Sequence, residues 1–354
     1  MMYINDLLGM AVTRGASDLH LKVGGGPVLR INGELIPQEQ APRLTAEDMK
    51  ALFVEVTTEE QREYFADELE SDFAYEADGL GRFRINVCQQ GGTLSIACRP
   101  VRTESPDIGE LGLPPVCKDL ALKTSGLVVV TGPTGSGKST TLAAMMNYLN
   151  QTEKRKVVTI EDPVEFVHQD IKCMFSQREL GRDTKSFANA VKHSLRQDPD
   201  VILVGEMRDL ETMAAALTAA ETGHLVLTTL HTPGAPQAVD RFIDIFPPHQ
   251  QQQVRIQLSL TLEGVIYQVL LPRMDGTGRV AAVEVMLATS AIRNLIREGK
   301  TYQLGNAIQT GVQYGMQTLN QALSALYRLR TITREEALKR SNEPEELAEM
   351  LDGH

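Results

Sequence analysis

A glycine-rich loop at residues 132–139 constrains this chain more than any other feature. The segment reads GPTGSGKS and fits the pattern G-x-x-x-x-G-K-[ST]. An apolar run at 127–130 precedes the loop, and a helical pattern over 139–151 follows it. Glycines in such a loop let successive backbone N–H groups point at phosphate oxygens, while the helix presents its positive end. The sequence therefore predicts a strand–loop–helix unit that binds the phosphates of a nucleotide.

Two side chains of this loop have separate expected roles. Lys138 would reach the β- and γ-phosphates, and Ser139 would bind Mg²⁺, so ATP and Mg²⁺ are the expected ligands. GTPases usually carry an N-K-x-D segment, and the sequence contains none. The loop alone leaves a kinase, a motor and a switch open. The expected phosphate-binding residues are Gly132, Pro133, Thr134, Gly135, Ser136, Gly137, Lys138, Ser139 and Thr140.

The remainder of the chain after the loop predicts an α/β fold. Further short apolar runs lie at 157–160, 201–204 and 225–227. Helical stretches separate these runs, which indicates a parallel sheet covered on both faces. From about residue 249 the pattern is mainly helical. The expected helices in the second part are 139–151, 186–197, 209–222, 249–271, 290–299, 316–328, 333–341 and 344–351.

The first hundred residues have a different pattern. Alternating strands at 17–23, at 27–31 and within 70–99 predict a small α+β domain over residues 1–99. Its expected helices are 2–14 and 45–64, the latter with a cap at Thr45 and Asp48, and a hairpin turn is expected at Asn32-Gly33. Four prolines and two glycines in residues 100–115 indicate a linker, which leaves 116–354 as the second domain.

Acidic residues follow two of the apolar runs. Glu161 and Asp162 come after 157–160, and Glu206 comes after 201–204. Ligands of parallel α/β sheets bind at the carboxyl ends of strands, so these carboxylates should lie near the phosphates. Phosphoryl transfer to water needs a carboxylate to orient or deprotonate the water, and others to hold Mg²⁺. We expect Ser139, Glu161, Asp162 and Glu206 to hold the metal, partly through water. Which of Glu161 and Glu206 is the base stays open.

Two histidines bracket the run at 225–227. His224 and His231 are seven residues apart, so in a regular strand they point to opposite faces and do not share a metal. His231, at the carboxyl end, is placed to donate to the γ-phosphate. Arg82, Arg84 and Arg99 lie on strands of the first domain and by themselves predict solvated faces or ion pairs. An ATPase also needs positive charge at the transition state, which these residues supply if the first domain swings over the nucleotide.

Composition excludes several classes of protein. A formal net charge of −11, only 5% aromatic residues and no Trp disfavour nucleic acid as a partner. No apolar run approaches the ~18 residues of a membrane span. The four cysteines contain no C-x-x-C pair, so a zinc site is not expected. Scattered cysteines and the lack of a signal-peptide pattern favour the cytoplasm.

Four segments together resemble the secretion-superfamily ATPases. They are the loop GPTGSGKST, the acidic box TIEDPVEF, the segment RQDPDVILVGEMRD and the histidine box TGHLVLTTLHT. ASDLH at 16–20 and GRFRIN at 81–86 resemble the small N-terminal domain of that family. Within it, the chain resembles the type IV pilus retraction ATPases of the PilT family. It begins directly with the small domain, has no tetracysteine insertion between Leu271 and Val280, and carries AIRNLIRE at 291–298.

The resemblance implies a PAS-like N-terminal domain, a RecA-like ATPase domain and a homohexameric ring with nucleotide at subunit interfaces. By position, Lys138, Glu161, Glu206 and His231 are its catalytic residues. Arg84 and Arg99 match the small-domain arginines that reach phosphate. The implied motor is cytoplasmic, peripheral to the inner membrane and works on a pilus platform protein, with a retraction paralogue as a further partner.

The sequence departs from the retraction branch at two places. Thr228-Thr229 stands where Phe-Gly is common, and residues 250–253 are all glutamine where charge is usual. These departures leave open an accessory, PilU-like retraction paralogue. A pilus-assembly or type II secretion ATPase, a non-enzymatic nucleotide switch and a DNA-translocating ATPase are further possible functions. The missing insertion, the paired acidic segments and the net charge speak against these three in turn.

Overall fold

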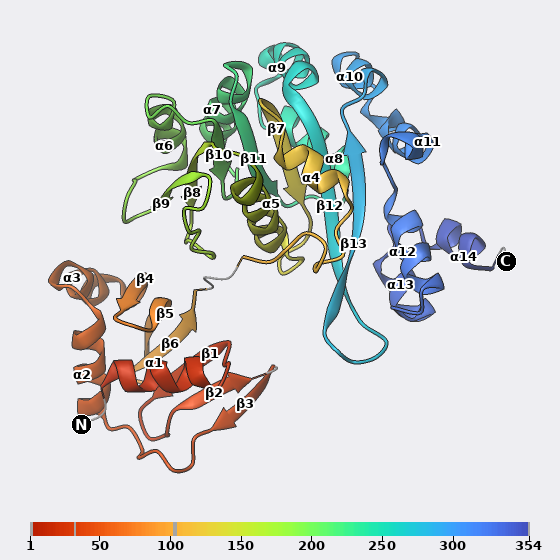
Figure 1. Ribbon diagram of the computed structural model, residues 1–354. Helices are drawn as coiled ribbons and strands as arrows, with labels where there is room; N and C mark the ends of the chain where they lie inside the picture. The colour runs from red at the N-terminus through yellow and green to blue at the C-terminus, as the bar shows by residue number, and fades with distance from the viewer. Residues whose placement is uncertain (1–2, 32, 102–104, 353–354) are drawn as a thin grey trace. The chain divides into compact units, whose positions relative to one another are not determined.

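The chain folds into two compact units, Met1–Thr103 and Glu104–His354. The structure is a computed structural model that describes residues 3–31, 33–101 and 105–352 (Figure 1). The boundary between the units falls inside the predicted linker at 100–115. Each unit has a sheet and a hydrophobic core of its own, as the change of sequence pattern indicates.

The first unit is an antiparallel six-stranded sheet with three helices. The strand order is β3-β2-β1-β6-β5-β4. Its core includes Ile4, Leu19, Met49 and Phe83, all fully buried. The α+β prediction for this part is confirmed. The elements are α1 (Ile4–Thr13), β1 (Asp18–Lys22), β2 (Val28–Ile31), β3 (Glu34–Pro37), α2 (Ala46–Val56), α3 (Glu59–Glu68), β4 (Glu70–Ala77), β5 (Gly81–Gln90) and β6 (Thr93–Pro100).

The expected helix at 45–64 is wrong as a single element. Its predicted cap is present, because Thr45 accepts a hydrogen bond from the Asp48 backbone. Helix α2 nevertheless ends at Val56, and Thr58 caps a second helix by accepting from the Gln61 backbone. Threonine side chains offer the backbone such alternatives to helical pairing, which ends one helix and begins the next. The expected hairpin between β2 and β3 is confirmed by their antiparallel pairing, while Asn32 lies outside the described residues.

The second unit is built on a seven-stranded sheet in the order β13-β12-β7-β11-β10-β8-β9. Six neighbouring strands run parallel, and β13 runs antiparallel to β12 at one edge. The central strands β7, β10 and β11 are buried along their whole length, as predicted for a sheet covered on both faces. The strands are β7 (Gly126–Thr131), β8 (Lys156–Glu161), β9 (Met174–Glu179), β10 (Val201–Val204), β11 (Leu225–Leu230), β12 (Leu262–Pro272) and β13 (Arg279–Leu287).

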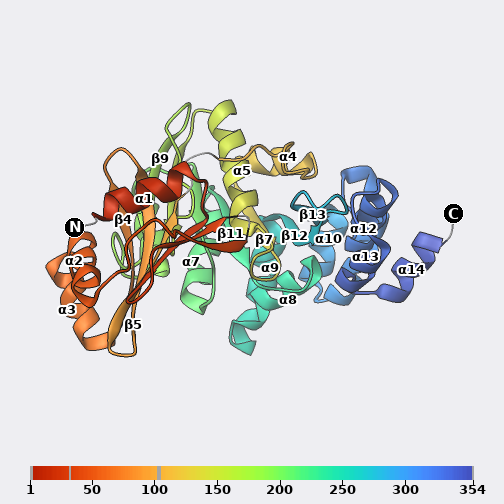
Figure 2. The same cartoon turned by 90° about the horizontal axis from the view of Figure 1, so that it is seen from below.

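Helices cover the two faces of this sheet unequally. One core packs the strands against α4 and α5, and the other packs them against α6 to α14. Figure 2 shows α12, α13 and α14 gathered beside the C-terminus. The helices are α4 (Val116–Ala121), α5 (Lys138–Thr152), α6 (Phe187–Ser194), α7 (Leu210–Glu221), α8 (Ala235–Asp244), α9 (Pro248–Thr261), α10 (Ser290–Arg297), α11 (Leu304–Thr310), α12 (Leu319–Arg328), α13 (Arg334–Arg340) and α14 (Pro344–Asp352). Among the described residues, no helix combines the length and apolar character needed to cross a bilayer.

The expected helix at 249–271 is wrong in its second half. Helix α9 ends at Thr261, and the chain continues as β12, which pairs with β7 and β13. The strand is buried on both faces through most of its length, so its apolar residues form a run that hides the two-residue period of a strand. The C-terminal part of the chain is therefore mainly helical only after β13, and not from about residue 249 as predicted.

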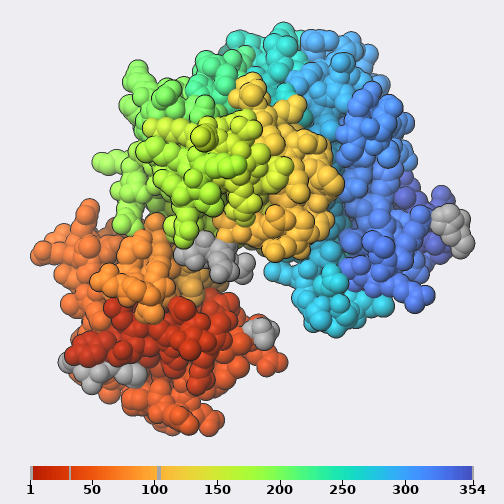
Figure 3. All heavy atoms as spheres, viewed as in Figure 1, coloured from red at the N-terminus to blue at the C-terminus, as the bar shows by residue number. Residues whose placement is uncertain are grey.

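The second half of the predicted linker packs as part of the second unit. Ile108 and Leu113 are 1% and 7% exposed and belong to the core that holds α4 and α5. The Asn147 side chain donates to the backbone carbonyls of Ser105 and Pro106, at 3.2 Å each. The gold-coloured atoms of this stretch lie against the rest of the unit in Figure 3. A proline- and glycine-rich composition is thus compatible with a well-packed, irregular segment.

Candidate active site

The carboxyl ends of four parallel strands bring the predicted site residues of the second unit together. The phosphate loop follows β7, His231 follows β11, Glu206 follows β10 by two residues, and Glu161 ends β8. These strands are neighbours in the sheet, in the order β7-β11-β10-β8. Ligands bind at this edge of an open parallel sheet. The predicted placement of these residues along one edge is therefore confirmed.

The phosphate loop owes its shape to glycines. Gly132, Gly135 and Gly137 have φ values of +148°, +76° and +87°, which side chains rarely allow. Gly137 directly precedes Lys138, the first residue of α5, so the loop ends at a helix N-terminus. The backbone thus has the conformation and the helix position that a phosphate group requires.

Lys138 lies inside this loop and not in solvent. Its side chain is buried, and Nζ donates to the carbonyls of Gly132 at 2.9 Å and Pro133 at 3.1 Å. Burial lowers the pKa of Lys138, although Glu165 and Glu206 act in the opposite direction. A cation that is buried with only carbonyl and imidazole partners is well placed to bind an anion.

A buried hydroxyl gives a second sign of an anion site. Ser136 Oγ is buried and has no hydrogen-bond partner among the described residues. It points toward Gly132, where an added Cβ would lie 2.7 Å from it. Buried hydroxyls are normally paired, so an orphan in this position fits a ligand that supplies an acceptor oxygen.

His231 and Glu206 lie beside the lysine. Nδ1 of His231 is 3.4 Å from Nζ of Lys138, and Nε2 is 4.0 Å from Oε2 of Glu206. Burial and the Lys138 charge lower the pKa of His231. Arg208 forms an exposed ion pair with Glu206 at 2.7 Å. The lysine, histidine and glutamate thus form one chain of contacts at the strand ends.

Glu161 is held by two partners of its own. It accepts from the Thr159 hydroxyl at 2.6 Å and from Nε2 of Gln177, on β9, at 3.2 Å. Burial raises the pKa of Glu161. Its backbone lies against Gly205, where an added Cβ would be 3.3 Å from the Glu161 Cα. Glu161 and Glu206 therefore lie at the ends of adjacent strands, and Gly205, next to Glu206 in sequence, packs against the Glu161 backbone.

The other predicted residues are placed less centrally. Asp162 is exposed. His224 lies at the opposite end of β11 from His231, where its Nδ1 is 3.0 Å from the carbonyl of Ala219. In the first unit, Arg84 and Arg99 are direct partners across β5 and β6 and so share a face of the sheet. Arg84 pairs with Asp72, and Arg99 pairs with Asp18 at 2.7 Å.

Sequence reasoning missed three residues that build the site. Gln177 binds Glu161, and Gln268 on β12 binds the phosphate loop. Thr232 binds Thr131, with 2.8 Å between the two hydroxyl oxygens, and ties the end of β11 to the end of β7. Gln177 and Gln268 lie outside every motif, and Thr232 ends the histidine box without a role assigned from the sequence. Each of the three lies far in sequence from the partner that it positions.

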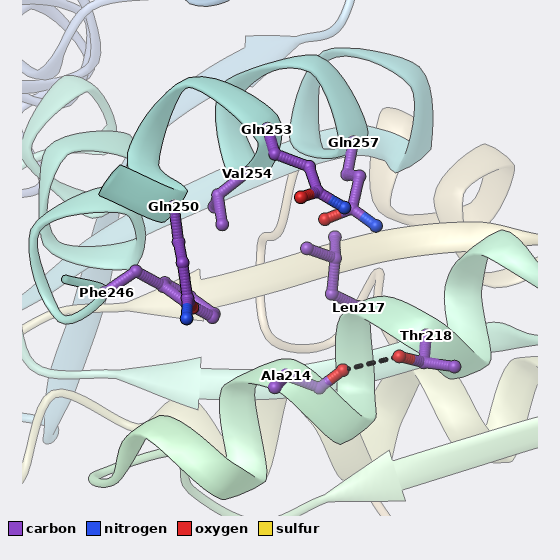
Figure 4. A pocket seen from close by; sticks show the side chains of 8 residues that line it. All are labelled: Ala214, Leu217, Thr218, Phe246, Gln250, Gln253, Val254 and Gln257. Atoms are coloured by element: carbon purple, nitrogen blue, oxygen red, sulfur yellow. Dashed lines mark hydrogen bonds between the residues drawn. The ribbon is translucent and has the colours of Figure 1, made fainter. Parts of the chain in front are cut away.

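The described residues contain no group of three or more His, Cys, Asp or Glu side chains that would form a metal cage. A Mg²⁺ site of the expected kind does not require such a cage, because Mg²⁺ keeps several waters and is bound by one or two protein groups and substrate phosphates. A separate cavity of about 260 Å³ lies between α7 and α9 (Figure 4), and none of its lining residues belongs to the strand-end site. It is lined by Ala214, Leu217, Thr218, Phe246, Gln250, Gln253, Val254 and Gln257.

Comparison with known proteins identifies the family. Residues 96–295 match the type II/IV secretion system protein family. The chain is 48% identical, over 97% of its own length and 99% of the relative's, to the type IV pilus retractation ATPase PilT of Pseudomonas aeruginosa. It is 42% identical to the type IV pilus ATPase PilU of the same organism, over 99% of this chain and 91% of that one. The chain belongs to the type II/IV secretion system protein family.

The fold agrees with the same family. A crystal structure of the pilus retraction motor PilT with bound ADP matches with a TM-score of 0.92 at 47% identity, covering 98% of this chain and 99% of that one. The α/β prediction is therefore confirmed at the level of a secretion ATPase fold. Residues 273–278, within the region from Leu271 to Val280, form the turn that joins β12 and β13.

Two segments singled out from the sequence have clear structural roles. The segment at 291–298 forms most of α10, with Ile292 and Ile296 fully buried as expected for an amphipathic helix. Arg293 anchors it by donating to the Ser259 and Leu260 carbonyls. Thr229 donates to the Gly205 carbonyl at 2.6 Å, next to Glu206.

Proposed function

We propose that this chain is an ATP-hydrolysing motor that drives retraction of type IV pili. The observation that carries the proposal is the contact chain from Lys138 through His231 to Glu206 at the end of the phosphate loop. The similarity to PilT over nearly the full chain supports pilus retraction as the process that this hydrolysis drives. Twitching motility would follow from retraction.

The proposed binding roles follow from the loop. Residues 132–140 hold the phosphates of ATP through backbone N–H groups, with Lys138 as the cation and Ser136 Oγ as a further donor. Ser139 would hold Mg²⁺, with Glu161, Asp162 and Glu206 acting through water. Bound Mg²⁺ would supply charge neutralisation of the phosphates. Lys138 would keep its place in the loop by exchanging its carbonyl partners for phosphate oxygens.

The proposed base is Glu161, and Glu206 orients water and His231. A carboxylate with a raised pKa accepts a proton more readily at neutral pH. Burial raises the pKa of Glu161, and its side chain is fixed by Thr159 and Gln177. Glu206 is tied to Arg208 and lies nearer to His231. The proposal thus gives separate roles to two carboxylates that the sequence leaves equivalent.

Three variants test whether these residues form a hydrolytic site. Lys138→Ala should abolish both ATP binding and phosphate release, because the buried cation is lost. Glu161→Gln and Glu206→Gln should keep ATP binding within about threefold but lower the rate of phosphate release by ~10²-fold or more. Binding is measured with a fluorescent ATP analogue and turnover by steady-state phosphate release. Normal turnover in Glu161→Gln would remove that residue as the base, and absent turnover in the wild-type protein would favour a non-enzymatic switch.

The proposed architecture and partners rest on the family resemblance. The strand order 3-2-1-6-5-4 supports a PAS-like first domain over about 1–99, and the loop on a parallel sheet supports a RecA-like ATPase domain from 116. The protein would form a homohexamer at the cytoplasmic face of the inner membrane. There it would act on the pilus platform protein, and a retraction paralogue would be a second partner.

A PilU-like accessory role is the second candidate. The 42% identity to PilU over 99% of this chain supports it, beside the higher identity of 48% to PilT. A deletion strain scored for surface pili and twitching separates the candidates. Loss of the main motor would leave many pili that do not retract, whereas loss of an accessory motor would leave retraction weakened and not absent. A bald strain would favour an assembly ATPase.

A further inference from the structure

Gln268 lies on β12 at the point where the neighbouring strand β7 turns into the phosphate loop. Tyr267 pairs with Thr131 in the sheet, so Gln268 comes alongside Gly132. Its side chain is only 1% exposed, although the residues around it on β12 are apolar. A buried amide needs partners for its donors and its acceptor, and these partners define what it holds.

Both ends of the Gln268 amide bind the loop and its helix. Nε2 donates to the Ser136 carbonyl at 2.5 Å, and Oε1 accepts from the Thr141 hydroxyl, on α5, at 2.7 Å. Ser136 lies within the loop, and Thr141 lies in the first turns of α5. The one side chain therefore fixes the loop relative to the helix whose N-terminus faces the phosphates.

Close packing against Gln268, by its carbonyl oxygen and its side chain, also restricts the shape of the loop. An added Cβ at Gly132 would lie 2.3 Å from the Gln268 carbonyl oxygen, and one at Gly137 would lie 3.1 Å from Nε2. Both glycines have positive φ values. The loop is thus pressed against β12 at its first and last glycine. Holding the Ser136 carbonyl on the Gln268 side leaves the neighbouring N–H groups to face the opposite way.

We propose that Gln268 is a positioning residue that holds the phosphate loop in its nucleotide-binding conformation. It makes no contact with the phosphates in this scheme. It acts by binding the Ser136 carbonyl and the Thr141 hydroxyl at the same time. Glutamine suits this task because its amide both donates and accepts, whereas glutamate has no donor for a carbonyl. The inference rests on the proposed ATP-binding function.

Substitution of Gln268 tests the inference. Gln268→Met keeps the shape of the side chain and removes both hydrogen bonds, so affinity for ATP and for ADP should fall about tenfold or more. Because the loop binds the phosphates throughout the reaction, KM for ATP should rise while kcat stays within about threefold. Gln268→Glu should bind more weakly still, since a carboxylate would face the Ser136 carbonyl beside the bound phosphates.

A second glutamine provides the matched control. Gln317 donates to the Val283 carbonyl at 2.7 Å in the same unit and lies outside the loop. Gln317→Met should leave nucleotide affinity unchanged. Unchanged ATP and ADP affinity in folded Gln268→Met would overturn the inference. Absence of ATP binding in the wild-type protein would instead overturn the proposed function.

Thr141 keeps the inference testable if Gln268 variants do not fold. Thr141→Ser retains the hydroxyl that donates to Gln268, and Thr141→Val removes it with little change in shape. Thr141→Ser should bind ATP as the wild type does, whereas Thr141→Val should bind several-fold more weakly. Equal affinity in these two variants would overturn the role of the Gln268 contact.

Discussion

At the scale of single residues, the contact between His231 and Lys138 favours one tautomer of the neutral imidazole. As an ammonium group Lys138 can only donate, so its 3.4 Å contact with Nδ1 of His231 favours the tautomer whose ring proton lies on Nε2, toward Glu206. Burial and the lysine charge both lower the pKa of His231 below its ordinary 6.5. The neutral tautomer is therefore the form present at neutral pH.

This state predicts the pH dependence of activity. As the pH falls through the lowered pKa, His231 gains a charge beside Lys138 and loses its acceptor nitrogen. We expect kcat/KM for ATP to fall in acid with a midpoint below 6.5, the ordinary pKa of histidine, and His231→Gln to lack that step. The ATPase pH profile, with an NMR titration of the ring, measures both. A midpoint above that ordinary value that disappears in His231→Gln would contradict the assigned state.

His168 predicts a pH effect on stability and not on catalysis. It stacks on Phe175 with 4.8 Å between ring centroids, and burial lowers the pKa of His168 to about 4. The unfolded chain takes up this proton near pH 6.5, but the folded protein does so only near 4, so stability is lost as the pH falls between these values. At pH 5 the loss is about 2 kcal/mol. His168→Gln should show a smaller drop in unfolding free energy between about pH 7.5 and 5 than the wild type, measured by urea titration. Equal drops would contradict the prediction.

The site residues divide clearly into those that the sequence reveals and those that it does not. Lys138, Glu161, Glu206 and His231 could be predicted because each follows an apolar strand, and parallel strands end at one edge. Gln268 could not be predicted, since a single glutamine in an apolar run has no signature of its own. Its role depends on a pairing between strands far apart in the sequence.

At the scale of elements, the loop and β12 predict a difference between two glycines. Gly132→Ala would place a Cβ 2.3 Å from the Gln268 carbonyl oxygen, whereas an added Cβ at Gly135 meets nothing within 4 Å. Both positions have positive φ, so both variants carry a backbone cost of about 1–2 kcal/mol. Only Gly132→Ala must also push the loop away from the strand. We expect it to lose nucleotide binding, and Gly135→Ala to be affected less. Calorimetric titration with ADP measures the difference, and equal affinities would show that β12 does not constrain the loop.

The strands could be predicted from the sequence where a short apolar run is bounded by helical stretches. Strands β7, β8, β10 and β11 are recognisable as short apolar runs between helices. The sequence of β12 suggests a helix instead, because burial on both faces removes the alternation that marks a strand. Helices α2 and α3 suggest a single helix because the second capping box, at Thr58 and Gln61, lies inside an otherwise continuous helical pattern.

At the scale of the whole molecule, the predicted site residues are divided between the two units. The second unit carries the phosphate loop and its carboxylates, while Arg84 and Arg99 belong to the first and pair there with Asp72 and Asp18. Rings are built from head-to-tail contacts, in which one surface of a subunit meets a different surface of the next. In the proposed hexamer, these arginines would leave their carboxylates and complete the site of a neighbouring subunit.

Mixing two inactive variants tests this arrangement. Lys138→Ala destroys the nucleotide site of its own subunit but keeps Arg84, and Arg84→Ala does the reverse. The two variants are combined in equal amounts by co-refolding or co-expression. If Arg84 acts on the neighbouring subunit, about a quarter of the interfaces in the mixed rings join an intact Lys138 to an intact Arg84, and ATPase activity returns. If Arg84 acts within its own subunit, every site lacks one of the two groups and the mixture stays inactive. Phosphate release from the mixture, compared with each variant alone, decides between the two, and persistent inactivity of verified mixed rings would rule out donation across the interface.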